Sequence, residues 1–198
     1  MNICVFGAAS NAIAARYLEE VGAFAAELAK RGHGLVFGGG ATGLMGAAAR
    51  GAAKAGGYIL GVAPTFFNVE GVLYQNCTEF IYTETMRERK QTMEDRSDAV
   101  VMVPGGIGTF EEFFEMLTLK QLGRNNKPIA VFNVGGYFDE MEEMLQKSAR
   151  EGFMSEGTLA LYRCFPDGTA LLDYLEQHSD VHPEADAVSL NNIRHADA

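Results

Sequence analysis

The chain has 198 residues, 47% of them hydrophobic, which is enough for one domain with a buried core. A formal net charge of −10 argues against non-specific nucleic-acid binding, which needs clustered Lys and Arg, whereas a small phosphorylated ligand needs only a local positive site. No apolar run approaches the ~20 residues of a membrane helix, and the first residues lack the basic leader of a signal peptide. Three scattered cysteines are typical of reduced thiols, so we expect a cytoplasmic protein.

Short apolar runs alternate along the chain with longer segments of helical periodicity. The runs predict strands at residues 2–7, 34–40, 58–64, 79–83, 98–106, 127–134 and about 160–165. The longer segments predict helices at about residues 11–31, 43–57, 84–97, 109–122, 137–151 and 168–178. Strands that are apolar throughout, each followed by a helix, indicate one α/β domain over residues 1–178, with a Rossmann-type open parallel sheet and helices on both faces.

Two segments fall outside this alternation. Residues 65–77 show no clear period, and we expect them to form a long loop near a site at the carboxyl ends of the strands. Residues 179–198 are polar and aperiodic, which predicts a mobile C-terminal tail.

The first glycine cluster, GGGATGLMG at 38–46, formally matches the G-x-G-x-x-G pattern of dinucleotide-binding turns. That function also needs an acidic residue at the end of the next strand, and GVAPTFF supplies none, so an NAD site is disfavoured. For Gly46 and Gly51 the composition favours close packing of the helix on a strand. For Gly39, Gly40 and Gly43, a backbone approach to a ligand competes with such packing.

The second cluster, PGGIGT at 104–109, is more specific. Its glycines end a strand and open a helix, so free amides and the positive end of the helix dipole point at one spot, as a phosphate requires. Thr109 and Glu112 also have the spacing of a helix capping box, and the pattern alone favours capping over catalysis for Glu112. The helical wheel agrees, because the aromatic residues after Thr109 define an inner face that leaves Glu112 out.

A third segment, TMRERKQTM at 85–93, places two cations between the apolar residues Met86 and Met93 on one helix face. A cation on an apolar face either has an anionic partner or extends its side chain past the edge of the core. The sequence leaves both interpretations open for Arg89 and Lys90.

Taken together and in this order, GGGATGLMG, MRERK and PGGIGTFEE resemble the LONELY GUY family of cytokinin riboside 5′-monophosphate phosphoribohydrolases. The similarity runs from about residue 3 to about Phe153. It implies a homodimer whose nucleotide site lies at the strand ends and is partly completed by the neighbouring subunit. One departure is the first loop, FGAASN, where the family usually has Cys-Gly-Ser-Ser, so Ala8 and Ala9 supply no hydroxyl or thiol.

The resemblance also assigns roles to residues. Glu112 takes the position of the signature glutamate and becomes the candidate catalytic carboxylate, and Arg89 becomes its partner. The residues implied in substrate and phosphate binding are Gly105, Gly106, Gly108, Thr109, Ser10, Gly39, Gly40, Gly43, Met86 and Lys90.

The implied reaction is hydrolysis of the N-glycosidic bond of an adenosine 5′-monophosphate, with or without an N6 substituent, to free base and ribose 5-phosphate. Such a reaction needs no metal or organic cofactor, and the four histidines show no convincing metal-ligand spacing. The alternative is a non-catalytic carrier of a nucleotide or of molybdenum cofactor, which the phosphate loop would serve equally well. A carboxylate beside an anionic cargo brings such a carrier little, which favours the enzyme.

Overall fold

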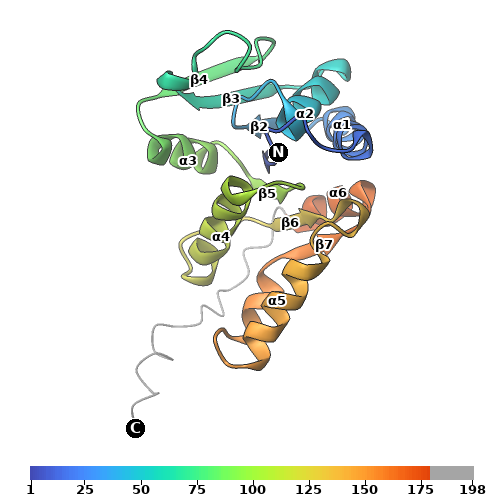
Figure 1. The fold of residues 1–198 in the computed structure, drawn as a ribbon, viewed down its shortest axis with the longest axis vertical. Helices are drawn as coiled ribbons and strands as arrows, with labels where there is room; N and C mark the ends of the chain where they lie inside the picture. Colours follow the sequence, from blue (N-terminus) through green and yellow to red (C-terminus); the bar gives the residue numbers. More distant parts are fainter. Residues whose placement is uncertain (179–198) are drawn as a thin grey trace.

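The computed structural model describes residues 1–178, so the predicted tail lies outside the described residues. Within them, seven strands form one sheet in the order β4-β3-β2-β1-β5-β6-β7 (Figure 1), and every neighbouring pair is parallel. The strands are β1 (Asn2–Phe6), β2 (Gly34–Phe37), β3 (Ile59–Pro64), β4 (Glu79–Thr83), β5 (Ala99–Met102), β6 (Ile129–Phe132) and β7 (Arg163–Phe165). The predicted α/β class and parallel sheet are confirmed.

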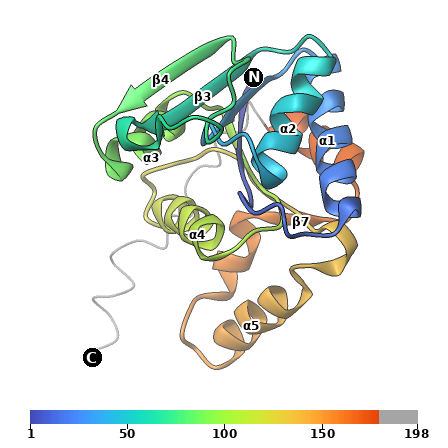
Figure 2. The ribbon, with the colours of Figure 1, turned by 45° about the horizontal axis from the view of Figure 1, so that its top comes forward.

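Six α-helices of the described chain cover the two faces of this sheet (Figures 1 and 2). One face carries α1 (Ala15–Lys30), α2 (Gly43–Lys54) and α6 (Gly168–His178). The other carries α3 (Met86–Asp95), α4 (Ile107–Gln121) and α5 (Asp139–Arg150). Short 3-10 turns complete the chain as η1 (Thr65–Phe67), η2 (Val134–Gly136) and η3 (Glu156–Leu161). None of the helices in residues 1–178 combines the length and the apolar character that crossing a membrane requires.

Alternation along β1 shows why the strands are apolar throughout. Ile3 and Val5 are buried beneath α1, α2 and α6, whereas Cys4 and Phe6 are buried beneath α3, α4 and α5. Because successive side chains of a strand point to opposite faces, the centre of a sheet covered on both sides buries every side chain and favours apolar residues. Polar residues occur at strand ends and on the edge strands, as Asn2, Glu79 and Arg163 do.

The strand order creates a switch point next to β1. The chain proceeds from β1 to β2, β3 and β4 on one side, then returns to place β5 on the other side. The loops that leave β1 and β5 therefore diverge, and a crevice opens between them at the carboxyl edge of the sheet. The topology thus places a binding site before any side chain is considered.

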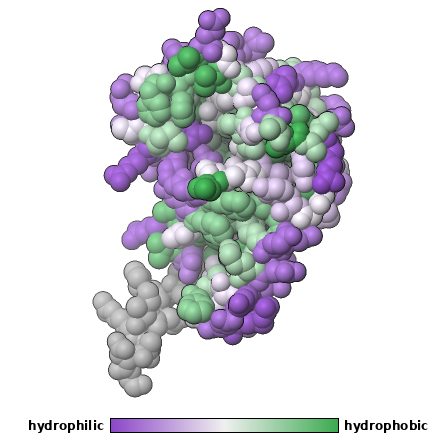
Figure 3. All heavy atoms as spheres, viewed as in Figure 1, coloured by the Kyte–Doolittle hydropathy of each residue, from purple (hydrophilic) through white to green (hydrophobic). Residues whose placement is uncertain are grey.

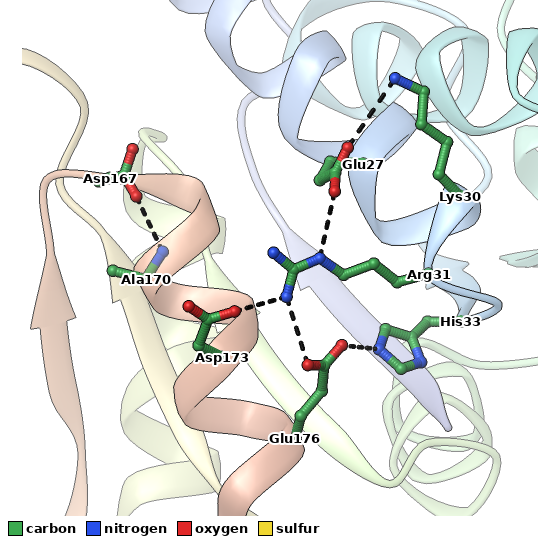
Figure 4. A network of polar contacts seen from close by, with 8 residues as sticks. All are labelled: Glu27, Lys30, Arg31, His33, Asp167, Ala170, Asp173 and Glu176. Carbon is green, nitrogen blue, oxygen red and sulfur yellow. Dashed lines mark hydrogen bonds and ion pairs between the residues drawn. The ribbon is translucent and has the colours of Figure 1, made fainter.

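A polar network ties α1 to α6 at the opposite end of the strands (Figure 4). The guanidinium of Arg31 lies 2.6 Å from Asp173 and 3.3 Å from Glu176, and it also bonds Glu27 at 3.2 Å. His33 Nε2 lies 2.8 Å from the second oxygen of Glu176. Arg31 is 21% exposed, but its three carboxylate partners are 38–52% exposed, so solvent screens these pairs and the network orients the last helix more than it stabilises the fold.

Small residues allow α1 and α2 to pack side by side (Figure 2). A Cβ built on Gly51 would lie 2.1 Å from the carbonyl oxygen of Gly22, and one on Gly46 would lie 2.0 Å from the carbonyl oxygen of Ala41. Both glycines are closely packed, as predicted, but neither packs on a strand. Gly46 meets the turn that precedes its own helix, and Gly51 meets the neighbouring helix α1.

This geometry predicts opposite effects for two alanine substitutions in the same contact. Gly51→Ala drives a methyl group into backbone and should lower the free energy of unfolding by about 1–3 kcal/mol. Gly22→Ala meets nothing closer than 3.5 Å, so its higher helix propensity should raise the free energy by about 0.5–1 kcal/mol. Urea denaturation measures both, and equal effects of the two variants would contradict the packing described here.

Candidate active site

A cleft of about 600 Å³ opens at the carboxyl edge of the sheet. Its volume falls within the roughly 300–1,000 Å³ of pockets that bind small molecules. The segments that follow β1, β2, β3, β4 and β5 all contribute to its walls. The cleft therefore lies where the sequence predicts a binding site, at the switch point of the sheet.

The turn between β5 and α4 forms one wall. Gly106 is the N-cap of α4, and no side chain caps this end of the helix. The amides of Ile107, Gly108 and Thr109 lie in the first turn, where helix geometry leaves N–H groups without intrahelical acceptors. A Cβ on Gly106 or Gly108 would meet no atom within 4 Å, so open space lies beside these amides. The turn is suited to receive an anion.

The helix begins earlier than the sequence indicated, at Ile107 rather than Thr109. Thr109 is consequently the third residue of α4 and cannot be its N-cap, so the capping box predicted for Thr109 and Glu112 is wrong. The capping box lies instead on α3, where Thr85 Oγ1 accepts from the amide of Glu88 and the Glu88 carboxylate accepts from the amide of Thr85. Glu112 is left without a capping role.

Two contacts fix the loop in place. Gly105 does not line the cleft, and a Cβ there would lie 2.1 Å from Thr109 Oγ1, so glycine lets the turn close over the threonine. The hydroxyl of Tyr137 donates to the carbonyl of Gly105 at 2.7 Å. Tyr137 follows the next strand, β6, and no local signal in the sequence identifies it.

Arg89 and Glu112 meet at the floor of the cleft. Arg89 Nη1 donates to Glu112 Oε1 at 2.7 Å, and Arg89 Nε donates to the carbonyl of Val62 at 3.2 Å. The two side chains are 7% and 12% exposed. Of the two interpretations left open for Arg89, an anionic partner is confirmed and extension past the core edge is wrong. Burial raises the pKa of Glu112, and the charge and hydrogen bond of Arg89 oppose that rise.

Gly38 makes room for this ion pair. A Cβ at Gly38 would lie 1.9 Å from Arg89 Nη2, where no side chain can be accommodated without moving the guanidinium. The sequence presents Gly38 as the first glycine of a phosphate-binding pattern, and nothing in that pattern shows that its neighbour is an arginine 51 positions later. The role of Gly38 depends on tertiary structure, because it is α3 that brings Arg89 to the end of β2.

The loop after β1 supplies Ala8, Ala9 and Ser10 to the cleft. The carbonyl of Ala8 accepts from the amide of Leu44 at 2.8 Å, and that of Ala9 accepts from Thr42 Oγ1 at 2.6 Å. Main-chain atoms therefore attach this loop to the start of α2.

Gly43 belongs to the same attachment. Its amide donates to Asn11 Oδ1 at 2.9 Å, and at φ +59° a Cβ would lie 2.4 Å from the carbonyl oxygen of Ala8. Of the two interpretations left open for this glycine, the structure thus shows close packing. Ser10 lines the cleft, and its Oγ accepts from the amide of Ala12 at 3.1 Å.

The segment 65–77 covers the far side of the cleft, as expected for a loop near the site. It is not structureless, because Leu73 forms a β-bridge with Gly40 and the amide of Tyr74 donates to the carbonyl of Gly39 at 2.8 Å. Gly40 lines the cleft, whereas Gly39 turns beneath Phe80 at φ +75° and does not. The apolar side chains that line this part are Met45, Phe67, Val72, Leu73 and Met86.

Lys90 lies apart from the cleft. Its Nζ lies 2.5 Å from Glu111 Oε1 and 2.7 Å from Glu115 Oε2. It lines a second cavity of about 290 Å³, and Glu112 is the residue that both cavities share. The contacts of Lys90 thus do not place it with the residues around the phosphate turn. Within residues 1–178, no group of three or more His, Cys, Asp or Glu side chains is arranged to hold a metal ion.

Comparison with known proteins places this cleft in context. The family model described as "possible lysine decarboxylase" matches residues 45–175. A cytokinin riboside 5′-monophosphate phosphoribohydrolase of Arabidopsis thaliana is 34% identical over 182 residues, which are 92% of this chain and 85% of the relative. A relative from Oryza sativa subsp. japonica, named a probable enzyme of the same kind, is 36% identical over 90% of this chain and 79% of its own length.

Solved structures of the same fold include proteins with another role in their titles. The molybdenum cofactor carrier protein of Chlamydomonas reinhardtii has a TM-score of 0.68 and 24% identity, covering 89% of this chain and 96% of that one. The molybdenum cofactor binding protein of Rippkaea orientalis has a TM-score of 0.69 and 20% identity, covering 89% and 95%. At this identity the likeness shows the fold alone.

The buried ion pair predicts a pH-dependent loss of stability in Arg89→Met. Without the guanidinium the pKa of Glu112 should rise further above its unfolded value, because Arg89 is what opposes the effect of burial. A group with a raised folded pKa favours the folded state at low pH and loses that contribution as pH rises. The variant should therefore lose more stability at pH 8 than at pH 5, on the order of 3 kcal/mol at the higher pH.

Urea denaturation at both pH values provides the measurement. The double variant Arg89→Met, Glu112→Gln has no carboxyl group to titrate and should lose equal stability at both. Lys54→Met, an exposed cation on α2 that lines neither cavity, should match the parent protein. A loss in Arg89→Met that is the same at pH 5 and pH 8 would contradict the assignment.

Proposed function

The chain belongs to the LONELY GUY family of cytokinin riboside 5′-monophosphate phosphoribohydrolases, and from this premise we propose that it hydrolyses the N-glycosidic bond of N6-substituted adenosine 5′-monophosphates. The products are the free base, a cytokinin or adenine, and ribose 5-phosphate. The observation that carries the proposal is the buried pair of Arg89 and Glu112 beside an uncapped helix N-terminus in one cleft. An anion site beside a carboxylate suits a sugar phosphate, because the phosphate can bind at the helix N-terminus while C1′ of the ribose reacts next to the carboxylate.

The phosphate end of the substrate is assigned to the β5–α4 turn. Open space lies beside Gly106 and Gly108, and the helix dipole adds a positive potential there. Thr109, in the same first turn, is assigned to the phosphate site with them. Gly105 shapes this turn from below. Ser10 and Gly40, which line the same cleft, are assigned to nearby contacts with the nucleotide, and Gly39 and Gly43 to the turns that hold those segments.

Glu112 follows Thr109 by three residues, so both lie on the same side of α4. A phosphate bound at the turn therefore directs the ribose toward the carboxylate. As the bond from C1′ to the base nitrogen breaks, the electron pair leaves with the base and positive charge develops on the sugar. Glu112 stabilises that charge and accepts a proton from the water whose oxygen bonds to C1′, and a proton from solvent neutralises the base nitrogen that carries the electron pair.

Arg89 keeps Glu112 ready for this role. Its guanidinium favours the ionised carboxylate against burial, and the hydrogen bond to the Val62 carbonyl fixes its orientation. The pair thus supplies a negative charge in a site where an isolated carboxylate would tend to be neutral.

The base is assigned to the part of the cleft beneath the 65–77 loop. Its lining of Phe67, Val72 and Met86 is apolar, and Met86 is 42% exposed. An apolar N6 substituent would bury its surface there, whereas plain adenine would leave part of the space to water. This supports a prenylated nucleotide over AMP as the preferred substrate.

A carrier of molybdenum cofactor is the weaker candidate. The carriers share the fold at under 25% identity, whereas the phosphoribohydrolases share 34–36% of their residues with this chain. A carboxylate at the floor of the cleft has a role in hydrolysis but none in carrying an anionic cargo.

We further propose that the protein is a cytoplasmic homodimer with a shared active site. Its three cysteines are free, as in a reducing compartment. Exposed apolar side chains on the layer of α4 and α5 support self-association, since Ile107 is 89% exposed and Met144 is 54% exposed. Figure 3 shows hydrophobic side chains gathered over α4 on one face of the molecule.

Release of free base from N6-isopentenyladenosine monophosphate and from AMP, followed by chromatography, tests the function. Glu112→Gln keeps the shape of the side chain and removes its charge, so kcat should fall by about 10²-fold or more in a folded protein. Glu143→Gln, an exposed carboxylate on α5, is the matched control and should leave kcat unchanged. Release of base by Glu112→Gln at the parent rate would remove the catalytic assignment.

The two substrates distinguish the remaining alternatives. A higher kcat/KM for the prenylated nucleotide would support the apolar base site, and equal values would leave AMP as the substrate. Tight binding of a pterin cofactor without release of either base would favour the carrier.

Sedimentation equilibrium tests the homodimer. The expected mass is twice the 21.4 kDa of the chain. Replacing the exposed Met144 by glutamate should shift the equilibrium toward monomer if this layer forms the interface, while Lys54→Glu on α2 should not. A parent protein that sediments as a monomer at micromolar concentration would contradict the proposal.

A further inference from the structure

Lys90 forms a second connection between α3 and α4, directly beside the catalytic pair. Arg89 and Lys90 are consecutive on α3, and Glu111 and Glu112 are consecutive on α4, so two ion pairs run between the same two helices. Lys90 also bonds Glu115 at 2.7 Å, one turn further along α4. Its side chain is 19% exposed, although its partners are 54% and 43% exposed. A lysine this covered is held in place rather than free in solvent.

The second cavity shows which side of Glu112 this connection occupies. Lys90, Glu112 and Glu115 line that cavity, whereas the substrate cleft contains Glu112 without Lys90. Glu112 therefore forms a partition between the two spaces, with substrate expected on one side and Lys90 on the other. A residue in this position can act on the reaction only through Glu112.

We infer that Lys90 is a positioning residue: it fixes α4 against α3 through Glu111 and Glu115 and balances the charge of Glu112 from behind. The inference rests on the proposed function and gives Lys90 a role other than contact with phosphate. The ion pairs with Glu111 and Glu115 fix the position of α4 and so of the Glu112 carboxylate. The positive charge of the Lys90 ammonium group also stabilises the ionised form of Glu112.

Several charged groups face Glu112, and their effects differ in sign. Arg89 and Lys90 on α3 lower its pKa, and Glu111 on its own helix raises it. Arg87, Glu94 and Glu115 line the second cavity, and the Cys4 thiol on β1 is close enough to feel the carboxylate, but its own pKa is raised far above neutrality and it stays uncharged. Removing Lys90 or Glu111 breaks the same ion pair, yet the two removals change the field at Glu112 in opposite directions.

This opposition gives a test that a purely structural role would not pass. The pH dependence of kcat/KM for base release should show an acid limb where Glu112 is protonated. Lys90→Met should move that limb to higher pH, and Glu111→Gln should move it to lower pH. A movement of half a pH unit corresponds to a roughly threefold change in kcat/KM on the limb, with smaller changes above it.

Three further variants make the result specific. Lys90→Arg keeps the charge and should restore the parent profile. Lys147→Met breaks an exposed pair with Glu151 on α5 and should leave the profile unmoved. Glu111→Gln alters a residue that is 54% exposed, so it should fold even if Lys90→Met does not, and its shift to lower pH tests the inference alone.

Other outcomes would overturn the inference. Equal losses of activity in Lys90→Met and Glu111→Gln, with no opposite movement of the acid limb, would mean that the ion pair is only structural. A raised KM in Lys90→Met, with the acid limb of the pH profile unchanged, would indicate that Lys90 binds the phosphate of the substrate. Absence of base release from the parent protein would instead overturn the proposed function, a result distinct from the failure of the positioning role.

Discussion

The central constraint on this structure is the cost of keeping a carboxylate nearly buried at the edge of a parallel sheet. An isolated charge at such a place is unfavourable by several kcal/mol or more, so it needs a partner of opposite sign with its own hydrogen bonds satisfied. Arg89 meets that need through the carboxylate and through the carbonyl of Val62. The guanidinium in turn needs space, which the missing side chain at Gly38 provides. One ion pair thereby connects α3 and α4 with β3 and with the end of β2.

Periodicity and composition were sufficient to predict the architecture, because the strands of a parallel sheet covered on both faces form runs of apolar residues that are easily identified in a sequence. The location of the site followed from the same topology, since the glycine clusters sit where strands end. The environment of Glu112 was not predictable in this way. Its partner lies 23 residues away on another helix. A helical wheel shows which residues of one helix share a face, but not which residues of another helix contact them.

The errors have identifiable physical causes. Thr109 and Glu112 have the spacing of a capping box, but α4 begins at Ile107, two residues before Thr109. The N-cap is therefore Gly106, and the spacing of Thr109 and Glu112 has no capping function. The contact of Tyr137 with the phosphate turn joins residues 32 apart, and only the assembled sheet brings them together. Family resemblance suggested the role proposed for Glu112, and its burial beside Arg89 supports that proposal. The shared fold of carriers and hydrolases shows that the architecture alone could not have distinguished them.

The first loop has a consequence for how such a site diversifies. Ala8 and Ala9 are joined to the start of α2 through their carbonyl oxygens, and the side chains contribute nothing to that joint. Ala8 is partly buried and packs against the core, whereas Ala9 is exposed. A substitution at residue 9 can therefore change what the rim offers to a ligand while the main-chain joint keeps the shape of the cleft, so a single position can alter ligand preference at little cost to the fold.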